Sequence, residues 1–264
     1  MLFIFFVYGD DMITSTPLNP HDLRVVITGG ARGIGQATAR ELASLGAHVF
    51  ITDVIETEGQ ALSKELGANT AYSNLDVVDP TAWQTVLSEA ERFMGGVNAL
   101  FNNAGIVSFG NTTGHEVADF RKVIDINLVG VYLGLKYSAP LIKKSGGGVI
   151  VNVSSTAGLQ GYANIAGYVA SKWGVRGLTK AAALDLAADN IRVLSLHPGP
   201  IRTPMTAALT DDIAGSQPIP RFGEAVEVAR MVRFMLLEAT YSTGSEFVVD
   251  GGAVTGQVLA LPEN

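Results

Sequence analysis

The chain contains no cysteine. This absence excludes disulfide bonds, zinc sites built from thiolates and cysteine nucleophiles. Only four histidines are scattered along the 264 residues, so we expect no metal site. A chain without cysteine also fits a reducing compartment, and we expect a cytoplasmic location.

Charged residues are scarce and basic residues are the scarcer kind. They make up 16% of the chain, with 18 Lys and Arg against 25 Asp and Glu, which gives a formal net charge of −7. An acidic chain without a basic stripe is a poor partner for nucleic acid or an anionic membrane. Hydrophobic residues reach 47%, which is enough for a large core, and the low fraction of charged residues suggests that other subunits cover part of the surface.

The N-terminal apolar run, residues 2–7, is far shorter than the ~20 residues that cross a bilayer. It also lacks the basic start and the small-residue cleavage site of a secretory signal. We expect residues 1–20 to be a loosely ordered extension, with Met12 as the natural start, and residues 21–264 to form a single domain. A short membrane-touching tail is the alternative.

Strand-like and helix-like segments alternate along most of the chain. Continuous apolar strands separated by helices predict a doubly wound parallel sheet, an α/β fold of the Rossmann type with three layers, α/β/α. Ligands of such folds bind at the carboxyl ends of the strands. The expected strands are 23–28, 47–53, 69–76, 97–102, 148–154, 191–197 and 246–249, and the expected helices are 35–45, 56–66, 81–93, 116–138, 168–187 and 225–237.

A glycine-rich loop, Thr28–Gly35, follows the first expected strand. A tight turn at Gly29 and the absence of a Cβ at Gly33 and Gly35 would let backbone N–H groups approach a pyrophosphate at a helix N-terminus. Glycine turns between a strand and a helix are also common structural devices. The strand before, the helix after and Asp53, 18 residues beyond Gly35, favour a dinucleotide site.

Two residues bear on which dinucleotide binds. A carboxylate at Asp53 would bind the adenosine ribose hydroxyls and repel a 2′-phosphate, which favours NAD. Arg32, beside the loop, could instead pair with that phosphate and favour NADP. We expect NAD, because Asp53 would lie against the 2′ position itself.

Four polar residues form a candidate catalytic set. Tyr168 and Lys172 stand four residues apart on an expected helix and share one face. Ser155 follows a buried strand, and Asn127 lies within the preceding long helix. Each residue alone could have an ordinary role in packing, at the surface or in a turn.

The ordered set of motifs resembles the short-chain dehydrogenases/reductases, in their compact branch, over about residues 22–252. Several stretches are similar to bacterial 3α/20β-hydroxysteroid dehydrogenases, members that use NAD despite an arginine in the phosphate loop. The motifs of the family are Thr28–Gly35, Asn102–Gly105, Asn127, Ser155, Tyr168–Lys172 and Pro198-Gly199, and the stretches of closer similarity are 27–33, 120–123, 170–177 and 197–199.

The resemblance implies hydride transfer between an alcohol or ketone and a nicotinamide. A phenol with a pKa of about 10 is a poor base at neutral pH, so the ammonium of Lys172 and the positive nicotinamide would lower the pKa of Tyr168. Lys172 would also hold the nicotinamide ribose. Ser155 would hydrogen-bond the substrate oxygen, and Asn127 would lie at a helix distortion whose water links Lys172 to solvent.

The resemblance also extends the expected cofactor site. Asp76 and Val77, at the end of the third strand, would contact the adenine. His197 stands where an asparagine is more usual, and we interpret it as a structural variant. The remaining expected cofactor contacts are Ile34, Asn103, Ala104, Gly105, Pro198, Gly199, Ile201 and Thr203.

The irregular stretch 203–222 is expected to form a lid with an apolar helical segment over the nicotinamide. Such a lid favours a bulky hydrophobic substrate, a hydroxysteroid among others, with terpenoid, sugar and other secondary alcohols open. Each candidate wall residue could equally serve ordinary lid packing. The candidate substrate residues are Val107, Leu159, Tyr162, Ile165, Met205 and Leu209.

Relatives in the family are commonly tetramers, and residues 181–188 and 247–252 are similar to their contact elements, so we predict a homotetramer. The competing interpretation is a non-catalytic NAD(P)-sensing regulatory protein, which would be expected to lack part of the Ser–Tyr–Lys set. An isomerase or dehydratase would carry a longer C-terminal region. A metal-dependent alcohol dehydrogenase is disfavoured by the absence of cysteine.

Overall fold

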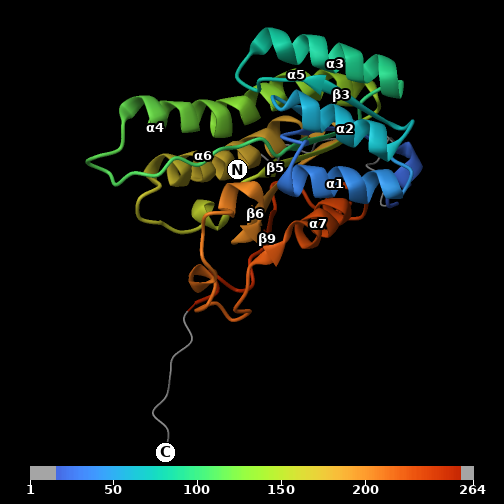
Figure 1. Ribbon diagram of the computed structural model, residues 1–264. Coiled ribbons are helices and arrows are strands. Elements are labelled where there is room, and N and C mark those ends of the chain that lie inside the picture. Colours follow the sequence, from blue (N-terminus) through green and yellow to red (C-terminus); the bar gives the residue numbers. More distant parts are fainter. Residues whose placement is uncertain (1–15, 257–264) are drawn as a thin grey trace, which may run out of the picture.

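The centre of the molecule is a seven-stranded sheet in which every pair of neighbouring strands is parallel. The computed structural model describes residues 16–256. Strand order is β3-β2-β1-β4-β5-β6-β9, so it reverses between β1 and β4 and confirms the predicted doubly wound fold (Figure 1). The strands are β1 (Arg24–Thr28), β2 (His48–Asp53), β3 (Thr70–Asn74), β4 (Ala99–Asn102), β5 (Gly148–Val153), β6 (Ile191–Pro198) and β9 (Glu246–Val249).

Helices cover both faces of the sheet, so the protein has two hydrophobic cores, one on each face. Successive residues of a strand point alternately into one core and the other. Val25 and Ile27 of β1 pack with the helices of one face, and Val26 packs with those of the other. Burial on both sides explains why the strands are continuous apolar runs. The first face is covered by α1 (Gly33–Ser44), α2 (Glu56–Leu66) and α7 (Ala225–Leu237), and the second by α3 (Pro80–Met94), α5 (Gly130–Lys144) and α6 (Ala166–Asp185).

The long helix expected at 116–138 is present but interrupted and longer. It consists of α4 (Val117–Ile124), a π-helical turn at Asp125–Val129, and α5, which runs past Pro140 to Lys144. Proline usually ends a helix, so the expected boundary was placed too early. Burial of Leu135 and Ile142 on the same face of α5 keeps the helix going beyond the proline.

The third strand is shorter than expected. It ends at Asn74, because its partner strand β2 ends at Asp53 and the last ladder bond runs from Leu75 N to the Asp53 carbonyl oxygen. Asp76 and Val77 therefore follow the strand and do not end it, which corrects the prediction.

The segment 203–222 contains two 3₁₀ turns, Pro204–Thr206 and Asp211–Ile213. The apolar helix expected there is wrong, since proline and glycine interrupt any longer run. A short parallel pairing of β7 (Ile201–Arg202) and β8 (Gly223–Glu224) joins the two ends of the segment. The segment is thus an irregular loop tied at its base.

The N-terminal extension predicted for residues 1–20 lies outside the described residues up to 15. Within the described part, the Leu18 N–H donates to the Leu237 carbonyl oxygen, so the chain is attached to α7 before β1 begins. No helix in residues 16–256 is long and apolar enough to span a membrane.

Candidate active site

The turn after β1 can be made only with glycine. Gly29 has a φ of +60°, and a Cβ there would lie 2.8 Å from Ala104 Cα. A Cβ on Gly35 would lie 2.2 Å from the Gly29 carbonyl oxygen. The loop therefore closes tightly at the start of α1, and the N–H groups of the first turn of that helix make a cradle that suits phosphate oxygens.

The residues after β4 brace this loop. Thr28 Oγ1 accepts from the N–H groups of both Asn103 and Ala104, each at 3.0 Å. In return, Asn103 Nδ2 donates to the carbonyl oxygens of Thr28 at 3.0 Å and Gly29 at 2.9 Å. Asn103 and Ala104 thus have a structural role beside the role expected along the cofactor.

Asp53 ends β2 and is 9% exposed. One oxygen accepts from Ala31 N at 3.0 Å and the other from Ile55 N at 3.1 Å. The carboxylate therefore holds the glycine loop and the turn into α2, and it also lines the main cavity. Each oxygen keeps lone pairs for ribose hydroxyls on the cavity side.

Tyr168 and Lys172 lie on α6 as predicted, with Lys172 Nζ 5.4 Å from the centre of the Tyr168 ring. Lys172 is 3% exposed, and its ammonium donates to the Val153 carbonyl oxygen at 2.8 Å. Burial lowers the pKa of Lys172 to about 8. An ammonium with this pKa titrates close to neutral pH.

Burial raises the pKa of the Tyr168 phenol, while a hydrogen bond with Ser155 acts in the opposite direction. Desolvation of the phenolate is the larger of the two effects. A positive group bound against the phenol would be needed to bring this pKa down.

Ser155 begins the short 3₁₀ turn Thr156–Gly158 and accepts from Ala157 N at 3.1 Å. Behind it, the fully buried His197 lies with Nδ1 3.1 Å from the Ser155 carbonyl oxygen and Nε2 2.9 Å from Ser195 Oγ. Burial lowers the pKa of His197, which favours the neutral ring. These contacts agree with a structural role for His197.

Asn127 lies in the π-helical turn and is fully buried. Its Oδ1 accepts from Ile106 N at 2.8 Å, and its Nδ2 donates to the Ile106 carbonyl oxygen at 2.9 Å and to Ser171 Oγ at 3.2 Å. The extra residue of a π turn aims the amide across the gap between the helix and the segment after β4. Asn127 therefore fixes Ile106 and α6 relative to each other.

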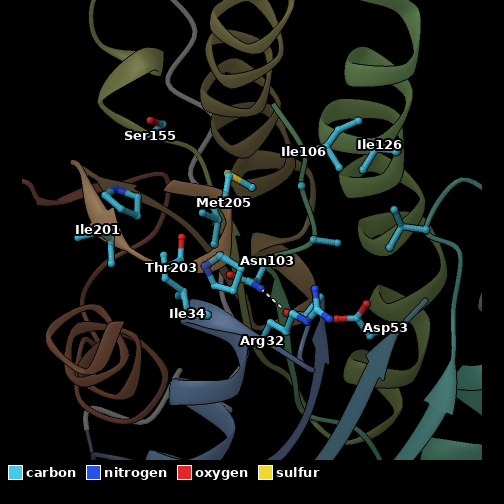
Figure 2. A pocket seen from close by; sticks show the side chains of 18 of the residues that line it. Arg32, Ile34, Asp53, Asn103, Ile106, Ile126, Ser155, Ile201, Thr203 and Met205 are labelled. Atoms are coloured by element: carbon cyan, nitrogen blue, oxygen red, sulfur yellow. Dashed lines mark hydrogen bonds between the residues drawn. The ribbon is translucent and has the colours of Figure 1, made fainter. Parts of the chain in front are cut away.

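A cavity of about 360 Å³ runs along the carboxyl ends of the strands, with Ser155 and Asp53 at opposite ends of the view in Figure 2. It brings together most of the predicted site. The predicted residues lining it are Gly29, Arg32, Gly33, Ile34, Asp53, Asp76, Val77, Asn103, Ala104, Gly105, Ser155, Tyr168, Lys172, Pro198, Gly199, Ile201, Thr203 and Met205.

Other lining residues were not predicted. Each is an apolar or small neighbour of a predicted residue, such as Ile106 after Gly105 and Ile126 before Asn127, and both face the cavity in Figure 2. No motif marks such positions, although proximity along the chain could have suggested them. The unpredicted lining residues are Val54, Ile55, Leu75, Ile106, Ile126, Val153, Ser154, Pro204 and Thr206.

Seven predicted residues do not line the cavity. Gly35 lies behind the loop against Gly29, and Asn127 lies behind Ile106. The other five are candidate substrate residues at partly or largely exposed positions, of which Tyr162 is 39% exposed and near enough to Tyr168 to raise its pKa. These five are Val107, Leu159, Tyr162, Ile165 and Leu209.

Among residues 16–256, no group of three or more His, Asp or Glu side chains is arranged to hold a metal ion. The cavity instead offers a glycine cradle, a carboxylate at Asp53, apolar walls at Leu75 and Val77, and a phenol beside an ammonium. Phosphates, a ribose, an adenine ring and a reacting hydroxyl each find a matching group, so a nicotinamide dinucleotide fits.

Comparison with known proteins gives one family. A profile of the short chain dehydrogenases matches residues 24–214. A 3-alpha-(or 20-beta)-hydroxysteroid dehydrogenase of Mycobacterium tuberculosis is 41% identical over 232 residues, covering 88% of this chain and 89% of the relative.

Two further relatives act on single rings by name. A trans-4-hydroxycyclohexanecarboxylate dehydrogenase of Sinomonas cyclohexanicum is 41% identical over 244 residues, covering 89% of this chain and 93% of the relative. A cyclohexanol dehydrogenase of an Acinetobacter species is 41% identical over 232 residues, covering 86% of this chain and 92% of the relative.

Proposed function

Because the chain belongs to the short-chain dehydrogenase family and is an oxidoreductase of the kind that uses a nicotinamide cofactor, we propose that it transfers hydride between NAD and a cyclic secondary alcohol or its ketone. One observation carries the proposal. Ser155, Tyr168 and Lys172 line the same cavity as the glycine loop and Asp53. Cofactor cradle and acid–base group are therefore within one site.

The cofactor would be held along the whole cavity. The N–H groups of the glycine loop would take the pyrophosphate, Asp53 the adenosine ribose, and Lys172 the nicotinamide ribose. When bound, the nicotinamide supplies the acceptor or donor of the hydride. The carboxylate of Asp53 favours a free 2′-hydroxyl over a 2′-phosphate, which supports NAD as the cofactor.

Tyr168 would take the hydroxyl proton of the alcohol during oxidation and return it during reduction. Burial raises the pKa of the phenol, and a positive nicotinamide would add to the charge of Lys172 in lowering it, so proton transfer would be coupled to cofactor binding. The Ser155 hydroxyl would hydrogen-bond the substrate oxygen and stabilise negative charge on it. General acid–base catalysis of this kind contributes roughly 10²–10⁴-fold to the rate.

Lys172 would act on Tyr168 as a nearby positive charge. Its ammonium is fixed by the Val153 carbonyl oxygen, so it lies beside the ring in a set position. Asn127 would act indirectly. It would hold the cavity-lining Ile106 in place relative to Ser171 of α6, the helix that carries Tyr168 and Lys172.

The names of the relatives share a secondary alcohol on a saturated ring, as in a steroid, a cyclohexanecarboxylate or cyclohexanol. Apolar side chains at Ile106, Ile126 and Met205 line the cavity and would suit such a ring. Val107, Leu159, Tyr162, Ile165 and Leu209 stay predictions for the outer wall of the substrate site.

We also propose a homotetramer. Trp173 and Leu184 of α6 are 46% and 81% exposed, and Phe234 of α7 and Val248 of β9 are 39% and 41% exposed. Exposed apolar groups on α6 and on the α7–β9 region suit two subunit contacts. A monomer in light scattering at working concentration would contradict this. The cytoplasmic location stays a prediction.

The test is NADH formation by the purified protein with cyclohexanol, a hydroxysteroid and a terpene alcohol, each with NAD and with NADP. Turnover of a ring alcohol with NAD is expected. Turnover with NADP alone would contradict the cofactor assignment. Binding of NAD without turnover of any alcohol or ketone would favour the NAD(P)-sensing alternative.

A further inference from the structure

Arg32 of the glycine loop is held by Glu58 of α2. Its Nε and Nη2 each donate to one oxygen of the Glu58 carboxylate, so the two groups meet through a pair of parallel hydrogen bonds. This fork-to-fork arrangement is the geometry in which a guanidinium binds a carboxylate or a phosphate best. Arg32 immediately precedes α1 and Glu58 is the third residue of α2, so the pair bridges the two helices next to the loop.

The pair lies where an adenosine ribose would bind. Arg32 and Asp53 both line the cavity, and Figure 2 shows them side by side at the end away from Ser155. The hydrogen bond with Glu58 and the charges of Glu58 and Asp53 raise the pKa of Arg32. The hydrogen bond with Arg32 lowers the pKa of Glu58. Arg32 and Glu58 therefore form a charged pair, and this guanidinium faces two acidic groups, Glu58 and Asp53.

Without Glu58, Arg32 would face only Asp53. Its guanidinium could then bind a 2′-phosphate, which is the contact that would favour NADP. With Glu58 present, a 2′-phosphate has to displace a carboxylate from the guanidinium and then lie close to two carboxylates.

We propose that Glu58 is a specificity-determining residue for the cofactor: by occupying the Arg32 fork, it makes the site reject NADP. The proposal rests on the use of NAD at this same site. It assigns the discrimination to two residues, with Asp53 opposing the 2′-phosphate directly and Glu58 withdrawing the only cation that lines that end of the cavity within residues 16–256.

The same two helices carry a matched control. Arg40 of α1 and Glu65 of α2 form a second fork-to-fork pair, and neither residue lines the cavity. The side chains of both pairs are about half exposed, so each pair contributes little to stability. Removing Glu65 therefore reproduces the loss of an α1–α2 ion pair without changing charge at the ribose.

The experiment measures dissociation constants of NADH and NADPH by calorimetry for wild type, Glu58→Gln, Glu65→Gln, Arg32→Leu and the Arg32→Leu/Glu58→Gln double variant. Adenosine 5′-monophosphate and adenosine 2′,5′-bisphosphate serve as fragments that isolate the 2′-phosphate. In Glu58→Gln, affinity for NADPH relative to NADH should rise about threefold to fivefold, the effect of one charge pair near a surface. Glu65→Gln should leave the ratio unchanged, and the gain should vanish in the double variant.

An unchanged ratio in Glu58→Gln would overturn the proposal, as would an equal rise in Glu65→Gln. If the relative affinity for NADPH still rises when Glu58→Gln is made in the Arg32→Leu background, Glu58 acts through its own charge and not by binding Arg32. That result would also contradict the proposal. Wild type that prefers NADPH would instead contradict the proposed use of NAD. Thermal unfolding of each variant identifies any that fail to fold.

Discussion

Replacing Lys172 by methionine should raise stability relative to wild type at neutral pH, and the relative gain should shrink as the pH rises. The ammonium is buried in wild type, and burial lowers its pKa from the usual 10.5 to about 8. A charged group whose pKa is lowered by folding opposes folding. This destabilisation is fully present below pH 8 and disappears as the pH rises through 10.5, the pKa of the lysine in the unfolded chain.

The magnitude follows from the shift. A difference of about 2.5 pKa units between folded and unfolded chain corresponds to roughly 3 kcal/mol of destabilisation at pH 7 and about 1.4 kcal/mol at pH 9.5. Methionine has a similar length and no charge, so the variant escapes this cost. It leaves the Val153 carbonyl oxygen without its donor, a loss of about 1–3 kcal/mol at every pH.

The assay is urea unfolding at pH 7 and pH 9.5, at one protein concentration, followed by tryptophan fluorescence. The free energy of unfolding of the variant minus that of wild type should fall by roughly 2 kcal/mol between the two pH values. Activity should be lost at both. A difference that does not change with pH would refute the argument that the buried ammonium opposes folding.

Three further predictions concern other parts of the site. Gly35→Ala, whose Cβ would lie 2.2 Å from a carbonyl oxygen of the same loop, should weaken NAD binding at least about tenfold in calorimetry, whereas Gly177→Ala, which meets nothing within 4 Å, should not. His197→Leu removes the donor to the Ser155 carbonyl oxygen and should lower kcat about tenfold with NAD affinity unchanged, while His197→Asn should restore much of the loss. Burial would raise the pKa of Glu246, but hydrogen bonds from two cations of α6 hold it at about 2. Glu246→Gln should therefore cost about 1–2 kcal/mol in urea unfolding at pH 7, with the difference fading as the pH falls from about 5 toward 2.

Much of the fold could be predicted because local pattern and tertiary packing agree. Val25, Val26 and Ile27 are consecutive apolar residues, and such a run is expected in a strand that is buried on both faces of a parallel sheet. All three residues are buried. Family membership could be predicted because glycine, serine, tyrosine and lysine motifs follow one another along the chain in a fixed order, and the profile match over residues 24–214 confirms it. The shared cavity then follows from the topology, since the predicted strands end at one edge.

The rest depends on contacts that no local pattern contains. Glu58 lies 26 residues from Arg32, and only the packing of α2 beside α1 brings the two together. His197 lies 42 residues from Ser155 and meets its backbone across neighbouring strands. The continuation of α5 past Pro140 and the early end of β3 are likewise decided by burial and by a partner strand, against local expectation.

The central claim is that Tyr168 transfers the proton in an NAD-dependent oxidation of a ring alcohol. The most direct measurement compares wild type with Tyr168→Phe for NADH formation from cyclohexanol, with NAD affinity measured in parallel by calorimetry. The account predicts turnover by wild type and a loss of about 10²-fold or more in the variant, with NAD binding retained. Turnover by the variant at the wild-type rate would contradict it.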